Sequence, residues 1–392
     1  MKPLDDITVI ALEHAIAAPL ATRHLADLGA RVIKIERPGS GDFARRYDER
    51  VRGLCSHFVW TNRSKESLTL DVKTARGREV LLRLLERADV FMQNLAPGAA
   101  ERLGLTAAAL RERHPRLIVC DISGYGPDGP YRDKKAYDLM IQAEAGLLSV
   151  TGTAGAPAKA GISVADIAAG MYAYSGILAA LRLRDRAGEG SHVEVSMLEA
   201  LAEWMGFPLY YASDGADPPP RSGAEHATIF PYGPFRTGDD EQVLLSVQNE
   251  REWACFCHDV LRRPELARDV RFAGNSLRNT HRDELRGIIE EVFMSLEPQA
   301  VVQRLDAAGI ANARVNAMGE VWNHPQLSAR HRWREVQSPV GALPALLPPA
   351  GNSAFDPRMD AIPALGEHTE SILAELGYSR SEVEALRKAG VV

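Results

Sequence analysis

Cysteine is scarce in this chain, whose 392 residues include only Cys55, Cys120, Cys255 and Cys257. So few thiols cannot form the disulfide framework of a small secreted domain. Cys255 and Cys257 lie two positions apart, whereas metal-binding motifs usually space their thiols more widely. We therefore expect reduced structural thiols and no metal site.

Positive charge and long apolar runs are lacking as well. The 46 basic residues are fewer than the 52 acidic ones, and the formal net charge of −6 argues against a nucleic-acid partner. No apolar run approaches the ~18 residues that cross a bilayer, so no membrane partner is expected. A predicted strand begins at Ile7 without the basic-then-apolar pattern of a secretory signal, which makes the cytoplasm the expected compartment.

The first third of the chain alternates strand and helix patterns. Helical patterns at Ala18–Leu28 and Thr74–Ala88 separate short β-rich runs, which lie at Ile7–Leu12, Arg31–Glu36, Ser67–Val72, Asp89–Leu95 and Leu117–Ser123. This alternation predicts an α/β fold with a mostly parallel sheet and right-handed crossovers. Ligands of such sheets lie where a strand ends and the next helix begins, and Arg37, Asn94 and Gly124 follow strands directly.

Two proline-rich stretches interrupt the later pattern. Residues 215–223 are typical of a linker, and residues 340–364 indicate an extended return path. Around them the patterns predict a helix at Ala165–Leu183, strands at Ser191–Leu198 and Gln242–Val247, and C-terminal helices at Thr369–Leu376 and Ser381–Ala389. We expect the C-terminal helices to dock on the first domain.

Residues 124–129 have the G-x-G-x-x-G spacing of a dinucleotide-binding loop. Such a loop opens a helix whose N-terminus holds the pyrophosphate. Here Pro127 and Pro130 flank the last glycine, Gly129, and the residues that follow do not open a helix. We interpret this segment as a turn-forming loop.

Asp166 is an isolated carboxylate among small and apolar residues in Gly161–Met171. As a structural residue it would occupy the first turn of a helix, where the helix dipole favours an acid. As a functional residue it would be a nucleophile, since a poorly solvated carboxylate attacks a carbonyl more readily. The residue type alone favours the structural role, and both interpretations remain open at this point.

The polar residues at the strand ends also allow two interpretations each. Arg37 is either a solvated loop residue or a bidentate partner of a phosphate group, to which Lys73, Arg102 and Lys135 add charge. Asn94 either caps the following helix or offers its amide to the amide groups of a pantetheine arm. No Gly-x-Ser-x-Gly elbow is present, which argues against an α/β-hydrolase.

Several ordered segments resemble the class III coenzyme A-transferases, the formyl-CoA transferase or CaiB/BaiF-like family. The resemblance runs from Leu4 to Val392, and its most specific parts are residues 27–42, 62–73, 94–105, 161–171, 231–235, 324–327 and 365–369. It implies a Rossmann-like large domain over residues 1–215, completed by 330–392, and a smaller α+β domain over 225–325. Residues 216–224 and 326–364 would be linkers, and two subunits would form an interlocked homodimer.

The resemblance also implies roles for individual residues. Asp166 matches the family's nucleophile, and coenzyme A enters as a substrate, with no prosthetic group. Contacts with coenzyme A are implied for Arg37, Leu70, Lys73, Asn94, Leu95 and Arg102, and contacts near the pantetheine and thioester for Lys135, Tyr137 and Asp138.

Two departures from the family bear on the substrate. The glycine-rich loop that covers the active site of formyl-CoA transferases has no equivalent in Leu245–Arg251, and Ile16 replaces a glutamine. Both differences argue against formyl or oxalyl substrates. We expect His14, Ile16 and His57 to line the substrate pocket, where imidazoles and the nearby Arg46 would hold a distal carboxylate.

The related α-methylacyl-CoA racemases carry a histidine where this chain has Tyr137. A phenol with an ordinary pKa near ~10 is a poor base at neutral pH. We therefore expect a CoA-transferase that acts on short dicarboxylates of the succinate, itaconate, mesaconate or citramalate type, through an aspartyl-CoA thioester. A racemase and a non-catalytic acyl-CoA-binding protein remain the alternatives.

Overall fold

The computed structural model describes residues 1–239 and 241–392. Internal contacts divide the chain into two compact units. The first unit comprises residues 1–146, 160–206 and 326–392, and the second comprises residues 147–159 and 207–325. The first unit is thus assembled from three separate parts of the sequence.

A six-stranded parallel sheet forms the centre of the first unit, as the sequence predicts. Its order is β3-β2-β1-β4-β5-β8, with every neighbouring pair parallel. The strands are β1 Thr8–Leu12, β2 Arg31–Glu36, β3 Lys65–Thr69, β4 Val90–Gln93, β5 Ile118–Ser123 and β8 His192–Ser196. This order has the doubly wound Rossmann arrangement, in which the crevice between β1 and β4 is the switch point where ligands bind.

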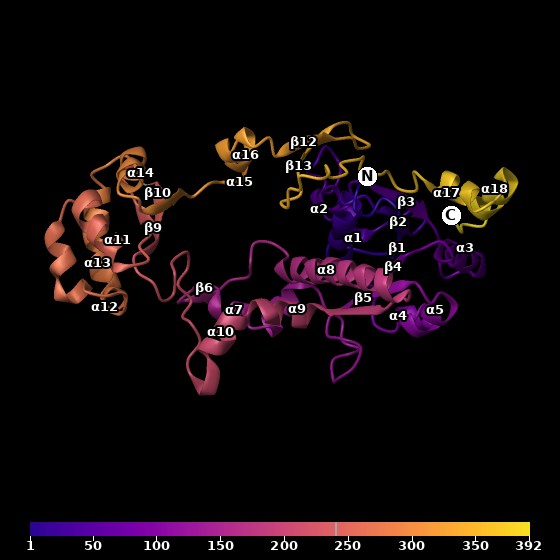
Figure 1. Ribbon diagram of the computed structural model, residues 1–392, viewed down its shortest axis with the longest axis horizontal. Helices are drawn as coiled ribbons and strands as arrows, with labels where there is room; N and C mark the ends of the chain where they lie inside the picture. Colours follow the sequence, from indigo (N-terminus) through magenta and orange to yellow (C-terminus); the bar gives the residue numbers. More distant parts are fainter. Residues whose placement is uncertain (240) are drawn as a thin grey trace. The chain divides into compact units, whose positions relative to one another are not determined.

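Helices cover both faces of this sheet because neighbouring strand residues point to opposite sides. Val9 belongs to the core cluster under α1 and α8, whereas Ile10 belongs to the cluster under α3 and the C-terminal helices. The first face carries α1 Ala17–Asp27, α6 Asp138–Glu144, α8 Val164–Ala187 and α9 Met197–Trp204. The second face carries α3 Ala75–Leu85, α4 Ala99–Leu103, α5 Ala107–Arg113, α17 Thr369–Glu375 and α18 Arg380–Lys388 (Figure 1).

Some predicted boundaries were wrong by a few residues, with identifiable causes. The strand predicted through Leu198 ends at Ser196 because the hydroxyl of Ser196 accepts the backbone N–H of Glu199 and starts α9. The predicted linker at residues 326–364 contains more structure than expected. Its strands β12 Trp333–Val336 and β13 Leu343–Leu346 form a hairpin that packs against Phe58 of α2 Ser56–Thr61.

Residues 124–129 confirm the interpretation as a loop. After β5 the chain makes turns until α6 begins at Asp138, so no helix N-terminus follows the last glycine. The short 3-10 segment η1 Phe43–Arg46 follows β2 in a similar way.

The second unit has its own antiparallel sheet, in the order β11-β10-β9. Its core cluster contains Phe230, Trp253 and Phe293. Its strands are β9 Tyr232–Arg236, β10 Gln242–Ser246, β11 Ala311–Arg314 and the small pair β6 Gly152–Thr153 and β7 Ala156–Pro157. Its helices include α7 Leu147–Val150, α11 Glu250–Cys255, α12 Asn275–Thr280, α13 Arg282–Phe293, α14 Pro298–Ala307 and α15 Met318–Val321, and α10 Gly206–Tyr211 and α16 Pro325–Ala329 begin at its borders.

Helix α8 corrects one expectation from the sequence. Within its 24 residues lies a window with a mean hydropathy of 1.4, which is long and apolar enough to cross a membrane. Core helices of soluble proteins pass the same test, and α8 places Ala165, Ala168, Ala169 and Ile177 in the core cluster on the first face of the sheet. Of this apolar window 44% is buried, and packing in this core accounts for the small side chains of the buried part.

Candidate functional site

Two loops meet at the carboxyl ends of β1 and β4. The loop after β1 carries His14 and Ala15, and the loop after β4 begins at Asn94. The side-chain oxygen of Asn94 accepts the backbone N–H of His14 at 2.9 Å, and its side-chain N–H donates to the carbonyl of His14 at 2.9 Å. Asn94 does not cap the next helix, since the N-cap of α4 is Gly98, and its expected contact with coenzyme A stays a prediction.

Asp166 lies in the first turn of α8, as predicted, and a close helix crossing brings it to the start of α1. Gly170, one turn later, allows this approach, since a Cβ at that position would lie 2.6 Å from the carbonyl oxygen of Ala17. Helix α1 begins at Ala17, and its preceding residue, Ile16, provides no side-chain cap. The backbone N–H of Ala17 contacts the Asp166 carboxyl.

The surroundings of Asp166 disfavour its charged form. Burial raises the pKa of this carboxyl to about 7, and the nearby Asp138 carboxylate acts in the same direction. A backbone hydrogen bond with Ala17 acts against both. A carboxyl with such a pKa is partly ionised near neutrality, and perturbed groups of this kind are concentrated at functional sites.

The Asp138 carboxylate binds backbone N–H groups at the start of α8, the helix that carries Asp166. The sequence did not reveal this role. One oxygen of Asp138 accepts the backbone N–H of Ala165 at 2.8 Å and that of Asp166 at 3.3 Å. Its other oxygen accepts the side-chain N–H of Gln142 at 2.6 Å. The N–H groups at the start of α8 are thus engaged, whereas Ala17 faces the Asp166 carboxylate.

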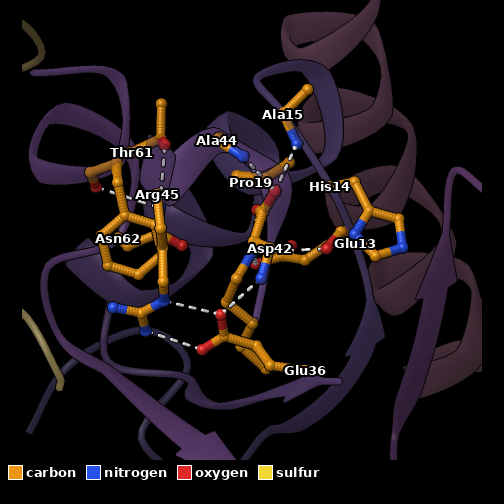
Figure 2. Close-up of polar contacts among 12 residues, drawn as sticks. Glu13, His14, Ala15, Pro19, Glu36, Asp42, Ala44, Arg45, Thr61 and Asn62 are labelled. Carbon is orange, nitrogen blue, oxygen red and sulfur yellow. Dashed lines mark hydrogen bonds and ion pairs between the residues drawn. The ribbon is translucent and has the colours of Figure 1, made fainter. Parts of the chain in front are cut away.

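A buried ionic network lies directly under the loop after β1. Lys34 bonds to Asp42 at 2.8 Å and to Glu13 at 3.3 Å, and Lys65 bonds to Glu13 at 2.7 Å, with all four side chains fully buried. Burial alone would raise the pKa of Glu13, but Lys65 and Lys34 outweigh it and hold that pKa below its usual value. Figure 2 shows the adjoining pair, in which Arg45 binds both oxygens of Glu36.

His14 lies beside this network with one ring nitrogen unsatisfied. Its Nδ1 is buried without a hydrogen-bond partner, and its ring stacks on Phe43 at 5.4 Å. Burial lowers the pKa of His14, and the nearby Arg37 acts in the same direction. Ile16, the other predicted pocket residue on this loop, is buried.

The residues expected to contact coenzyme A fall into exposed and buried groups. The four cationic ones are exposed: Arg37, Lys73 and Lys135 lie on loops after strands, and Arg102 lies in the short helix α4. Tyr137 is also exposed, and Leu95 packs partly against the core. Leu70 lies entirely in the core, so its side chain can support a nucleotide site but not line it.

A hollow of about 350 Å³ adjoins Arg37 and Leu70 along the chain. It is lined by residues from the loop after β2, the end of β3 and the C-terminal segment, namely Pro38, Gly39, Thr69, Leu365, Gly366, Thr369, Arg387 and Val392. Both ends of the chain therefore contribute to the surface on which a nucleotide was expected.

His57 lies with Asp48 and Cys55 in a compact cluster. The Nδ1 of His57 is 3.6 Å from a carboxylate oxygen of Asp48 and 4.0 Å from the Cys55 sulfur. Asp48 already accepts the N–H and the O–H of Ser56 and thereby holds the start of α2. The geometry is explained by this local role, and the expectation of no metal site stays a prediction.

Comparisons with known proteins agree on a family. The profile of CoA-transferase family III matches residues 4–369. The succinyl-CoA:glutarate CoA-transferase of Mus musculus is 32% identical over 100% of this chain and 91% of its own length. The acetyl-CoA:oxalate CoA-transferase of Acetobacter aceti is 35% identical over 84% of this chain and 85% of its own. A CAIB/BAIF family protein from Brucella suis, known as a crystal structure, matches with a TM-score of 0.85 and 32% identity, covering 96% of this chain and 99% of its own.

Proposed function

Because the chain belongs to CoA-transferase family III, we propose that it moves coenzyme A from an acyl-CoA donor to a free short dicarboxylic acid, with Asp166 as the nucleophile. The observation that carries this proposal is the buried Asp166 carboxyl, whose pKa is raised to about 7 at the start of α1. A weakly solvated carboxylate attacks a thioester carbonyl more readily than one surrounded by water.

The proposed reaction has two symmetrical halves. The Asp166 carboxylate attacks the donor thioester, which expels the CoA thiolate and leaves a mixed anhydride. The thiolate then attacks the aspartyl carbonyl, giving an aspartyl-CoA thioester and the free donor acid. The acceptor carboxylate attacks this thioester to form a second anhydride, and the thiolate attacks the acceptor acyl carbon to release the new acyl-CoA and the Asp166 carboxylate.

The start of α1 is the better source of oxyanion stabilisation. The N–H groups of Ala165 and Asp166, at the start of α8, are occupied by Asp138. The backbone N–H of Ala17 faces the carboxylate that forms both anhydrides. Preorganised N–H donors of this kind stabilise developing negative charge with little reorganisation.

Coenzyme A has cationic partners at the proposed nucleotide end. Arg37, Lys73 and Lys135 are exposed on loops that follow strands, and Arg102 is exposed in the short helix α4. A guanidinium such as that of Arg37 matches the geometry of phosphate oxygens. These residues support the proposal in an acidic chain because they gather positive charge at one edge of the sheet.

The unsatisfied Nδ1 of His14 supports an acidic acceptor. With its pKa lowered by burial, the ring is neutral at neutral pH and can donate one hydrogen bond to a carboxylate. The exposed Arg46 lies on the same stretch as Phe43, whose ring stacks on His14. We propose four- and five-carbon dicarboxylates such as succinate, glutarate, itaconate, mesaconate and citramalate as donor and acceptor acids. The interlocked homodimer and the cytoplasmic location belong to the same proposal.

The test mixes purified protein with succinyl-CoA and a panel of free acids, and follows new acyl-CoA species by mass spectrometry. We expect new thioesters with dicarboxylates that vanish in Asp166→Ala. Acceptance of monocarboxylates alone would refute the substrate class, and full turnover in Asp166→Ala would refute the mechanism. Deuterium exchange next to the thioester carbonyl without any acceptor acid would instead indicate a racemase.

A further inference from the structure

We infer that Asn94 is a positioning residue, which together with Asp42 holds the turn at His14–Ala17 so that the Ala17 N–H stays aimed at Asp166. This inference rests on the proposed function. It assigns Asn94 an effect on the chemical step and not on coenzyme A affinity.

Asn94 pairs with protein backbone through both ends of its side-chain amide. Its side-chain oxygen and nitrogen pair with the N–H and the carbonyl of His14, both at 2.9 Å. This pairing continues the contact between β1 and β4 by one residue beyond the strands. These two bonds use one side-chain N–H and one lone pair of Asn94, so its hold on the turn does not depend on any contact that the second N–H makes.

The turn that Asn94 holds has a conformation that the chain resists. Ala15 has a φ of 61°, in the left-handed region that costs a residue with a Cβ about 1 kcal/mol or more. Such a conformation persists only where the surroundings enforce it. The bonds of Asn94 to His14 fix the residue just before Ala15.

Asp42 fixes Ala15 itself from the other side. One oxygen of Asp42 accepts the N–H of Ala15 at 3.2 Å and that of Ala44 at 2.9 Å (Figure 2). Its other oxygen binds the buried Lys34 at 2.8 Å. Asp42 thereby anchors the turn to β2.

The buried lysines also fix the entrance to the turn. Lys34 and Lys65 bind Glu13, and Glu13 accepts the hydroxyl of Thr22 on α1 at 2.6 Å. The turn is therefore held at Glu13, His14 and Ala15, two to four residues before Ala17. Loss of one hold should let Ala15 relax and move the Ala17 N–H, and misplacement by about 1 Å can cost about 10²-fold in rate.

Asn94→Ala removes both bonds to His14, and Asn94→Asp removes the donor alone. For each variant we expect kcat to fall by about 10²-fold, CoA affinity by calorimetry to stay within about twofold, and amide exchange in the peptide around residues 13–18 to accelerate. Asn275→Ala is the matched control, since Asn275 pairs in the same two-sided way with Phe230 and Thr228 in the second unit. It should alter melting temperature but neither kcat nor exchange at residues 13–18.

Three results would overturn the inference. One is weakened CoA binding with wild-type kcat at saturation, which would make Asn94 a ligand contact. Another is unchanged exchange at residues 13–18 in Asn94→Ala, and the third is an equal loss of kcat in Asn275→Ala. Absence of transfer by the wild-type protein would refute the proposed function separately, and the exchange measurement would still decide whether Asn94 holds the turn.

Discussion

Asp166 should make the native protein less stable as pH rises, which is an unusual sign for an acidic residue. Its carboxyl has a pKa of about 7 in the folded state, against 3.8 in the unfolded chain. The folded state is therefore more stable when Asp166 is neutral. This contribution to the free energy of unfolding is fully present below pH 4 and is lost as the pH rises to 7. The substitution Asp166→Asn removes the titration while keeping the shape of the side chain.

The size of the effect follows from the pKa difference. One pKa unit corresponds to about 1.4 kcal/mol, so Asp166→Asn should stabilise the protein by about 2 kcal/mol at pH 5 and by about 4 kcal/mol at pH 8. Urea unfolding of both proteins, followed by tryptophan fluorescence at the two pH values, measures the difference. The pH dependence comes from the deprotonation of a buried acid that has no cationic partner among its named neighbours.

Asp269→Asn provides a control of opposite sign. A hydrogen bond from Arg271 lowers the pKa of Asp269 to about 2, so its carboxyl is ionised in both states at pH 5 and at pH 8. This substitution should destabilise the protein by the same amount at the two pH values. A stabilisation by Asp166→Asn that is equal at pH 5 and pH 8, or larger at pH 5, would refute the assignment of Asp166 as a buried acid with a raised pKa.

Three further predictions concern activity. Because the nucleophile must be ionised, kcat/KM should rise with pH about tenfold per unit below a midpoint near 7. The substitution Asp138→Asn should lower that midpoint. A pH–rate profile of this variant without the shift would show that Asp138 does not influence the pKa of Asp166. Gly170→Ala places a Cβ against the carbonyl of Ala17, so it should cost about 1–3 kcal/mol of stability and lower kcat. An unchanged kcat would show that the helix crossing does not position Asp166. Arg37→Ala should raise the Kd for CoA but not for a pantetheine fragment without phosphates, and equal losses for both would place Arg37 elsewhere.

The parallel sheet and the position of Asp166 were predictable because both depend on local patterns. Alternating strand and helix signals imply parallel strands, and the residues around Asp166 are strongly helical. The strand order was not predicted, and the role of Asn94 depends on it. Asn94 can bond to His14 only because β4 lies beside β1, whereas β2 and β3 come between them in the sequence.

The buried ionic network leaves a recognisable feature in the sequence. Lys34 stands in the middle of Arg31–Glu36, a strand that is otherwise apolar at its centre. Interior parallel strands are buried on both faces, so a lysine there must meet a buried acid. The roles of Asp42 and Asp138 left no comparable trace, since each bonds to backbone groups that lie far away in the sequence or on another helix.

The raised pKa of Asp166 and the strained turn at Ala15 describe one arrangement. Burial and the nearby Asp138 destabilise the ionised form of Asp166, and a strained loop holds the Ala17 N–H that faces it. Natural proteins retain such unfavourable features mainly where activity depends on them. The buried ion pairs around Glu13 supply the rigidity that keeps the arrangement in place.

The most direct test of the account is to trap the covalent intermediate on Asp166. Purified protein mixed with succinyl-CoA and no acceptor acid would be quenched, digested and analysed by mass spectrometry. The account predicts that the peptide containing Asp166 gains the mass of coenzyme A minus water, that hydroxylamine removes this mass, and that Asp166→Asn never acquires it. Rapid transfer of CoA to an acceptor acid with no adduct at Asp166, or with the adduct at another residue, would contradict it.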